Sequence, residues 1–117
     1  MIFLASIVLM QSLPLWGPDT FTGTWVVHNE TRDKQCQIIL TDKLEGQGTK
    51  RGYDVSGDPK CLKRIGLEGV SRWSTIPGGI IVVTDHARPI ATYQRADDGT
   101  LKGGAPLTDR FTLRRAK

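Results

Sequence analysis

Residues 23–27, Gly-Thr-Trp-Val-Val, begin the part of the chain that the sequence marks as β-structure. We expect a strand over residues 24–27, a polar turn over residues 29–34 and a second strand over residues 35–41. In the second strand Cys36, Ile38 and Leu40 fall on one face, because side chains alternate between the two faces of a strand. The signals from Gly23 onward are therefore those of β-structure.

Further short strands follow at intervals of about 8–12 residues, separated by glycine- and proline-rich turns. The clearest hairpin is centred on Pro77-Gly78-Gly79, and another closes at Ala96-Asp97-Asp98-Gly99, where Asp-Gly is a favoured turn pair. No segment has a helical stripe over three turns. The pattern predicts an all-β sandwich or barrel. The remaining strands are expected at residues 50–55, 69–76, 80–84, 90–95, 100–103 and 110–115.

Size and charge narrow the class of protein further. The chain has 117 residues, enough for one domain, and 38% of them are hydrophobic, which is too many for a disordered chain. The formal net charge is +4, with acidic residues interleaved among the basic ones. The densest basic patches, residues 60–64 and 114–117, lie away from the aromatic residues. A nucleic-acid partner is not expected, because such proteins combine a basic stripe with stacking aromatics.

The two cysteines, Cys36 and Cys61, suggest a disulfide, with two independent buried thiols as the alternative. Closing a loop of about 25 residues stabilises a small fold by roughly 3–4 kcal/mol in the chain-entropy model. A zinc site would need about four ligands, and the sequence has neither a C-x-x-C motif nor a nearby histidine pair. A disulfide implies an oxidising compartment, which is the periplasm or the cell exterior.

The chain before Gly23 divides into two segments. Residues 2–10 are almost entirely apolar and too short to span a bilayer, so we expect residues 1–11 to be a signal peptide or apolar leader, with an apolar first strand as the alternative. Residues 12–22 contain Pro14 and Pro18, which disfavour a helix. This second segment is an extended arm that is unusually rich in leucine, tryptophan and phenylalanine. It either packs across the mouth of the domain at residues 23–117 or binds a partner.

Nothing in the sequence indicates catalysis, a metal site or a cofactor. The only adjacent carboxylates, Asp97 and Asp98, stand before a glycine, where turn chemistry explains them. His28 and His86 lie at predicted strand ends, where a solvated histidine is the default. A nucleophile elbow, a phosphate-binding loop, a dinucleotide fingerprint and a zinc signature are all missing from the sequence. We therefore expect a protein that is not an enzyme.

The triplet Gly23-Thr24-Trp25 is similar to the G-x-W that begins small up-and-down barrels of the lipocalin and avidin type. In those barrels the indole closes one end and packs beneath an arginine of the last strand. Here Phe111, Leu113 and Arg115 share one phase of the last strand, so an arginine is available to stack on Trp25. An ordinary core tryptophan is the alternative, and it leads to nearly the same fold.

The whole set of motifs resembles the alkaline protease inhibitor family of Gram-negative bacteria, over residues 20–116. This resemblance implies an eight-stranded antiparallel up-and-down β-barrel, lipocalin-like, monomeric and periplasmic, with one disulfide between Cys36 and Cys61. Gly23, Trp25, Trp73 and Arg115 would be its structural residues. The residues that carry the resemblance are Gly23-Thr24-Trp25, Cys36 with Ile38 and Leu40, Gly52-Tyr53, Cys61-Leu62, Arg72-Trp73, Pro77-Gly78-Gly79, Tyr93, Gly99 and Leu113-Arg114-Arg115.

Members of that family inhibit secreted serralysin-type zinc metalloproteases with the N-terminal trunk of the mature protein. Carried onto this sequence, the trunk would contain Ser12, Leu13, Pro14, Leu15 and Trp16. A free α-amine near residue 12 would bind the catalytic zinc and displace its water. Pro14, Trp16 and Pro18 depart from the family pattern in the trunk. Two other classes remain as alternatives: a small-ligand-binding lipocalin-like barrel and an envelope-associated structural module.

Overall fold

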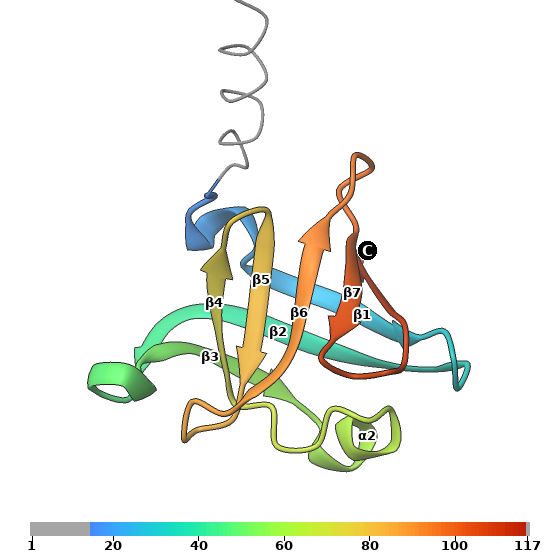
Figure 1. Ribbon diagram of the computed structural model, residues 1–117, viewed down its shortest axis with the longest axis horizontal. Coiled ribbons are helices and arrows are strands. Elements are labelled where there is room, and N and C mark those ends of the chain that lie inside the picture. The colour runs from blue at the N-terminus through green and yellow to red at the C-terminus, as the bar shows by residue number, and fades with distance from the viewer. Residues whose placement is uncertain (1–14, 117) are drawn as a thin grey trace, which may run out of the picture.

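Eight antiparallel strands close into one barrel, in which each strand pairs with its neighbours along the sequence and β8 pairs with β1 (Figure 1). The computed structural model describes residues 15–116, apart from the side chain of Ala105. The eight-stranded antiparallel barrel predicted from the sequence is thereby confirmed. Its strands are β1 (Gly23–Asn29), β2 (Lys34–Glu45), β3 (Gly52–Gly57), β4 (Arg72–Ile76), β5 (Gly79–Val83), β6 (Pro89–Arg95), β7 (Leu101–Ala105) and β8 (Phe111–Arg115).

The second strand is longer than its sequence pattern suggested. A register shift between Leu40 and Leu44 interrupts its pairing with β3, and beyond this bulge the two strands continue to the short 3-10 turn η2 (Gly48–Lys50). The alternation of apolar residues stops at Leu40, and for that reason the predicted strand ended near Thr41. The β2–β3 hairpin extends to the side of the barrel in Figure 1.

The interior of the barrel is filled by side chains from all eight strands. In β1 the inward residues are Trp25 and Val27, and in β2 they are Cys36, Ile38 and Leu40, as the alternation predicts. The largest side chains with less than 2% exposure include Trp25, Trp73, Tyr93, Phe21 and Phe111. A small eight-stranded barrel has room for little besides its own side chains.

A short helix, α2 (Pro59–Arg64), lies between β3 and β4 and was not predicted. Asp58 caps its start, with the carboxylate accepting a hydrogen bond from the Lys60 amide at 3.0 Å, and Pro59 occupies the first turn. The helix buries Leu62 in the core. With six residues it is too short to show a helical period, so the Asp-Pro pair is its only sequence signal.

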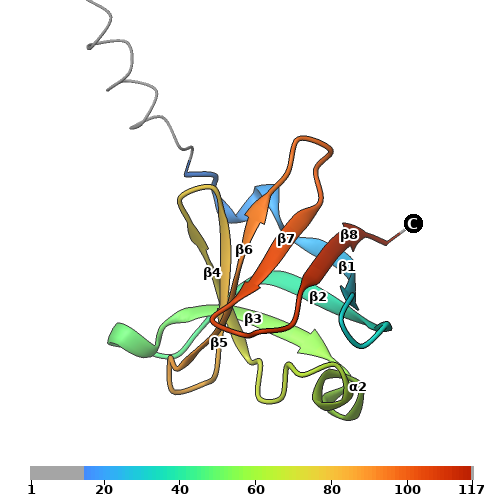
Figure 2. The ribbon, with the colours of Figure 1, turned by 45° about the vertical axis from the view of Figure 1, so that its right-hand side comes forward.

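One disulfide joins Cys36 of β2 to Cys61 of α2, with the Cα atoms 6.0 Å apart. The alternative of two independent thiols is therefore wrong. The bond fastens α2 to the inward face of β2, and Figures 1 and 2 show this helix at the end of the barrel opposite the arm. Within residues 15–116 there is no helix of the length and apolarity needed to cross a membrane.

Candidate functional site

The N-terminal arm meets the barrel at the end remote from α2 (Figure 1). Residues 18–20 form the 3-10 turn η1 (Pro18–Thr20), and the next residue, Phe21, is 1% exposed. The Trp25 indole donates a hydrogen bond to the Phe21 carbonyl at 2.8 Å. Phe21 is thus a plug in the barrel mouth, and the end of the arm belongs to the folded domain.

Arg115 fastens the same segment from the last strand. Its guanidinium lies 4.4 Å from the centre of the Trp25 ring and donates hydrogen bonds to the carbonyls of Thr20 and Thr22. This is the arginine-over-tryptophan stack for which the sequence offered a candidate. Gly23 leaves room for it, because a Cβ there would lie 2.8 Å from the Arg115 Nη1 and the backbone φ is +128°.

Trp16 anchors the arm one turn earlier. Its ring packs edge-on against Phe21, with centroids 6.0 Å apart, and the Arg95 guanidinium covers its face at 5.3 Å. Leu15, by contrast, is 68% exposed. The described chain therefore changes at Trp16 from a solvated residue to packed structure, and Trp16 is less free to enter a partner than the sequence suggested.

Trp73 supports the plug from inside the barrel. It is fully buried, its ring lies edge-on to Phe21 at 6.4 Å and tilted against Tyr53 at 5.2 Å, and its indole donates to the Thr41 carbonyl at 2.8 Å. A continuous series of aromatic contacts thus runs from Trp16 through Phe21 to the barrel core. Such a series gives the arm a rigid base.

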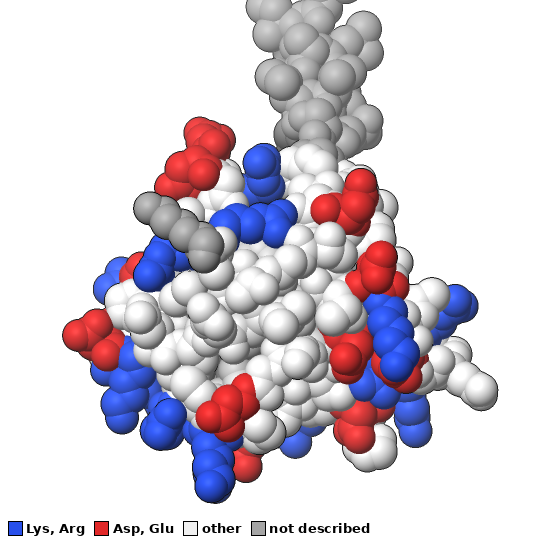
Figure 3. Space-filling view, turned by 180° about the vertical axis from the view of Figure 1, so that it is seen from behind, with Lys and Arg blue, Asp and Glu red and all other residues white. Residues whose placement is uncertain are grey.

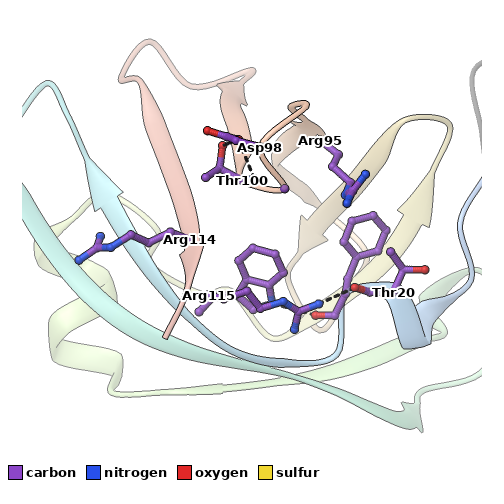
Figure 4. Close-up of a pocket in the computed structure, with 9 residues that line it drawn as sticks. Thr20, Arg95, Asp98, Thr100, Arg114 and Arg115 are labelled. Carbon is purple, nitrogen blue, oxygen red and sulfur yellow. Dashed lines mark hydrogen bonds between the residues drawn. The ribbon is translucent and has the colours of Figure 1, made fainter. Parts of the chain in front are cut away.

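A cavity of about 310 Å³ opens beside this base, between η1 and the β6–β7 turn (Figure 4). Phe21 and Trp25 contribute its apolar lining, and Arg95, Arg114, Arg115 and Asp98 contribute its charges. Two hydrogen bonds from Thr100, from the amide at 3.0 Å and the hydroxyl at 2.7 Å, hold the Asp98 carboxylate. These bonds lower the pKa of Asp98 below its ordinary value, so it is charged at neutral pH.

The titratable side chains elsewhere do not form a reactive cluster. His28 pairs with Asp33 at 3.0 Å and His86 with Asp85 at 3.7 Å, both as exposed neighbours. Over residues 15–116 no group of three histidine, cysteine, aspartate or glutamate residues lies close enough to hold a metal ion. Figure 3 shows the rear face with basic and acidic side chains around its edge and an uncharged centre.

The residues proposed from the sequence fall into three groups. Gly23, Trp25, Trp73 and Arg115 meet at the arm end of the barrel. Leu15 and Trp16 lie where the arm joins that end, while Ser12, Leu13 and Pro14 lie outside the described residues.

Sequence reasoning missed Phe21 and Arg95. Phe21 stands four residues before Trp25 and reads as part of the arm. Arg95 could have been noticed only as the last residue of the strand expected at residues 90–95.

Comparisons with known proteins agree on a family and a fold. The crystal structure of a psychrophilic marine protease MP inhibitor superimposes with a TM-score of 0.67 at 16% identity, covering 86% of this chain and 100% of that one. At this identity the likeness shows the fold alone. Among curated proteins none matches the sequence. The family model of the protease inhibitor Inh matches residues 15–115, and the chain therefore belongs to the Inh family of protease inhibitors.

Proposed function

We propose that this protein is a periplasmic inhibitor of a secreted, serralysin-type zinc metalloprotease, and that its mature N-terminal arm enters the active-site cleft. Membership in a protease inhibitor family supports inhibition of a protease. The observation that carries the arm mechanism is the abrupt change at Trp16. Leu15 is 68% exposed, whereas the Trp16 ring packs between Phe21 and Arg95 on the barrel; of the residues between Trp16 and Phe21, Gly17 and Asp19 are exposed.

The reach of such an arm suits the task. Residues 12–15 are the only trunk residues that precede the anchor at Trp16. Fully extended, four residues span at most about 13–14 Å. An arm of that length would let the amine reach a metal that lies within about 13–14 Å of the anchor at Trp16. The packed barrel end, with Phe21 as its plug, keeps the rest of the inhibitor outside.

The chemistry of the proposed contact follows from the metal. A catalytic zinc keeps one coordination position open for water. An α-amine has a pKa near 8, so its neutral form can take that position at physiological pH. Pro14 restricts the backbone of the arm and lowers the entropy lost on ordering it. The residues after the amine would then lie in the cleft as a bound product does.

The filled interior of the barrel favours this function over a lipocalin-like binding function. Trp25, Trp73 and Tyr93 are each at most 1% exposed and occupy the space that a ligand would need.

The decisive experiment compares three N-termini on the same barrel against a serralysin-type protease. The mature start is first established by mass spectrometry. We expect deletion of residues 12–15 to raise the inhibition constant by at least 100-fold while the midpoint of thermal unfolding stays within about 2 °C, because Trp16 and its contacts remain. One extra residue before the mature start should weaken inhibition similarly, since it moves the amine.

A length-matched control replaces residues 12–15 with Gly-Ser-Gly-Ser. This arm keeps its amine and its reach but loses its side chains, so it should retain part of the inhibition. Tight inhibition by the deleted protein, with its barrel intact, would refute the arm mechanism. A failure of the native protein to inhibit any zinc metalloprotease would refute the proposed function.

A further inference from the structure

We propose that the cavity beside the arm binds a carboxylate side chain of a partner protein. This proposal rests on the proposed function: the partner is the target protease, and the carboxylate belongs to the rim of its active-site cleft. The cavity is lined by Thr20 and Phe21 of the arm and by Arg95, Asp98 and Arg115 of the barrel. It thus adjoins the segment that would enter the protease.

The geometry brings two guanidinium groups to one opening. Arg95 ends β6 and Arg115 ends β8, and both line the cavity. In Figure 4 Arg115 reaches Thr20, and Arg114, which also lines the cavity, points away from the other two arginines. Each guanidinium is held against an aromatic ring, Arg95 on Trp16 at 5.3 Å and Arg115 on Trp25 at 4.4 Å. A stacked guanidinium is already ordered and therefore loses less entropy when it binds a carboxylate.

The charge of these two groups is not neutralised within the described chain. Over residues 15–116, no aspartate or glutamate oxygen lies within 4.0 Å of a guanidinium nitrogen of Arg95 or Arg115. Arg115 spends two of its N–H groups on the carbonyls of Thr20 and Thr22, and a guanidinium has five. The Arg95 guanidinium has no hydrogen bond to any of residues 15–116, although its backbone amide donates to the Gly78 carbonyl. Donors thus remain at both groups for an incoming acceptor.

The one carboxylate at the opening, Asp98, is occupied elsewhere. Its Oδ1 accepts both hydrogen bonds from Thr100, within its own turn. The lining of the cavity therefore carries a net positive charge from three arginines, Arg95, Arg114 and Arg115, and one carboxylate, with Phe21 and Trp25 as its apolar part. A glutamate or aspartate side chain fits this combination, since its methylene groups meet the rings and its oxygens meet the guanidinium groups.

The first test needs no protease. The side-chain Nε–Hε signals of Arg95 and Arg115 are followed by NMR while acetyl-(Glu)₃-amide is added, with acetyl-(Gln)₃-amide as the neutral control. We expect the acidic peptide alone to shift both signals. Arg95→Gln should weaken binding roughly two- to tenfold. Asp98→Asn should strengthen it roughly twofold, because Asn keeps the acceptor for Thr100 and loses the negative charge.

Two variants outside the cavity control for net charge. Arg51→Gln removes one positive charge and Asp42→Asn one negative charge, both at exposed positions of the β2–β3 hairpin. Neither should change the affinity for the acidic peptide by more than about 1.5-fold. The proposal is overturned if Arg51→Gln weakens binding as much as Arg95→Gln, or if Asp98→Asn weakens it. A purely structural role of these residues would not produce opposite signs.

The same variants are then assayed against the protease. Arg95→Gln should slow association and reduce its dependence on salt, and Asp98→Asn should speed association. Peptide binding with the expected signs, but no protease inhibition by the native protein, would keep the cavity site and refute the proposed function. Inhibition that none of the cavity variants changes, together with unshifted arginine signals, would refute the cavity site and leave the arm mechanism standing.

Discussion

Replacing Asn29 with alanine should cost this small barrel a large part of its stability. Asn29 ends β1 and is 0% exposed, and no other polar residue within residues 15–116 is buried to this degree. The side-chain amide nitrogen of Asn29, Nδ2, donates to the Ile65 carbonyl at 2.8 Å and to the Asp109 carboxylate at 2.9 Å. The side-chain oxygen of Asn29, Oδ1, accepts a hydrogen bond from the backbone amide of Arg32 at 3.1 Å. One side chain thus joins β1, the chain after α2 and the β7–β8 loop.

The expected loss follows from those three bonds. Each hydrogen bond contributes about 0.5–1.5 kcal/mol net, and a buried group left without its partner costs about 1–3 kcal/mol. Asp109 keeps its bond from the Arg32 guanidinium at 2.9 Å, whereas the Ile65 carbonyl loses its partner. We therefore expect the free energy of unfolding to fall by about 2–4 kcal/mol. For a domain of about 100 residues this lowers the midpoint of thermal unfolding by roughly 10–20 °C.

Urea unfolding followed by tryptophan fluorescence measures the loss directly, with the disulfide intact in every sample. Gln37→Ala is the control, because Gln37 is exposed on the outer face of β2 and should change stability by less than about 0.5 kcal/mol. Asn29→Asp adds a second test. Its buried carboxylate would face Asp109, so it should destabilise strongly at pH 7 and less near pH 4.5, where one of the two carboxyls gains a proton.

The sign of this pH effect follows from linkage. Burial and the neighbouring carboxylate would raise the folded-state pKa of the introduced aspartate above its unfolded value, so the penalty grows as pH rises. An Asn29→Ala variant within about 0.5 kcal/mol of the native protein would refute the assignment of Asn29 as the joint of these three segments. An Asn29→Asp variant equally unstable at both pH values would refute the electrostatic part.

Two further predictions concern the core. Replacing both Cys36 and Cys61 with alanine should lower the free energy of unfolding by about 3–4 kcal/mol, because the disulfide closes a loop with a sequence separation of 25; urea unfolding measures this, and a loss below about 1 kcal/mol would contradict it. Burial raises the pKa of Tyr93 above its ordinary value, so the unfolded chain ionises first and stability should fall as pH rises above about 10. Tyr93→Phe should flatten that decline, because phenylalanine has no hydroxyl to ionise. The substitution breaks no hydrogen bond, since the Tyr93 hydroxyl has no partner within residues 15–116. A slope of stability against pH that is unchanged between about pH 9 and 11 would contradict this prediction.

The strand pattern was sufficient for an all-β sandwich or barrel because the strands follow a simple rule, and the resemblance to the inhibitor family selected the eight-stranded barrel. Inward residues such as Trp25, Val27, Ile38 and Leu40 alternate with outward ones, and glycine or proline marks nearly every turn. Alternation fails where a segment is too short or too irregular to repeat. The helix α2 has six residues, so its capping residues Asp58 and Pro59 were its only trace. The bulge after Leu40 likewise hid the length of β2.

The alternation of apolar residues could not reveal the buried role of Asn29 or the anchoring of Trp16 on the barrel. Asn29 begins a polar stretch that is typical of a turn, yet its side chain is buried because a distant carbonyl and a distant carboxylate meet it there. Trp16 resembles an exposed anchor for a partner, but Arg95 and Phe21 hold it on the barrel. Both errors arise from contacts between residues far apart in sequence, which no local pattern records.

In the proposed arm mechanism, Arg115 links the stability of the barrel to inhibition. In the β1–β8 pairing that closes the barrel, Arg115 stands opposite Trp25, and the same side chain holds the carbonyls of Thr20 and Thr22. Weakening the pairing of β8 with β1 would therefore also free the segment at Thr20 and Thr22 that Arg115 holds. If the arm enters the protease cleft as proposed, a mobile arm loses more entropy on entering it, so changes at the C-terminal strand should weaken inhibition even though that strand is far from the arm in sequence.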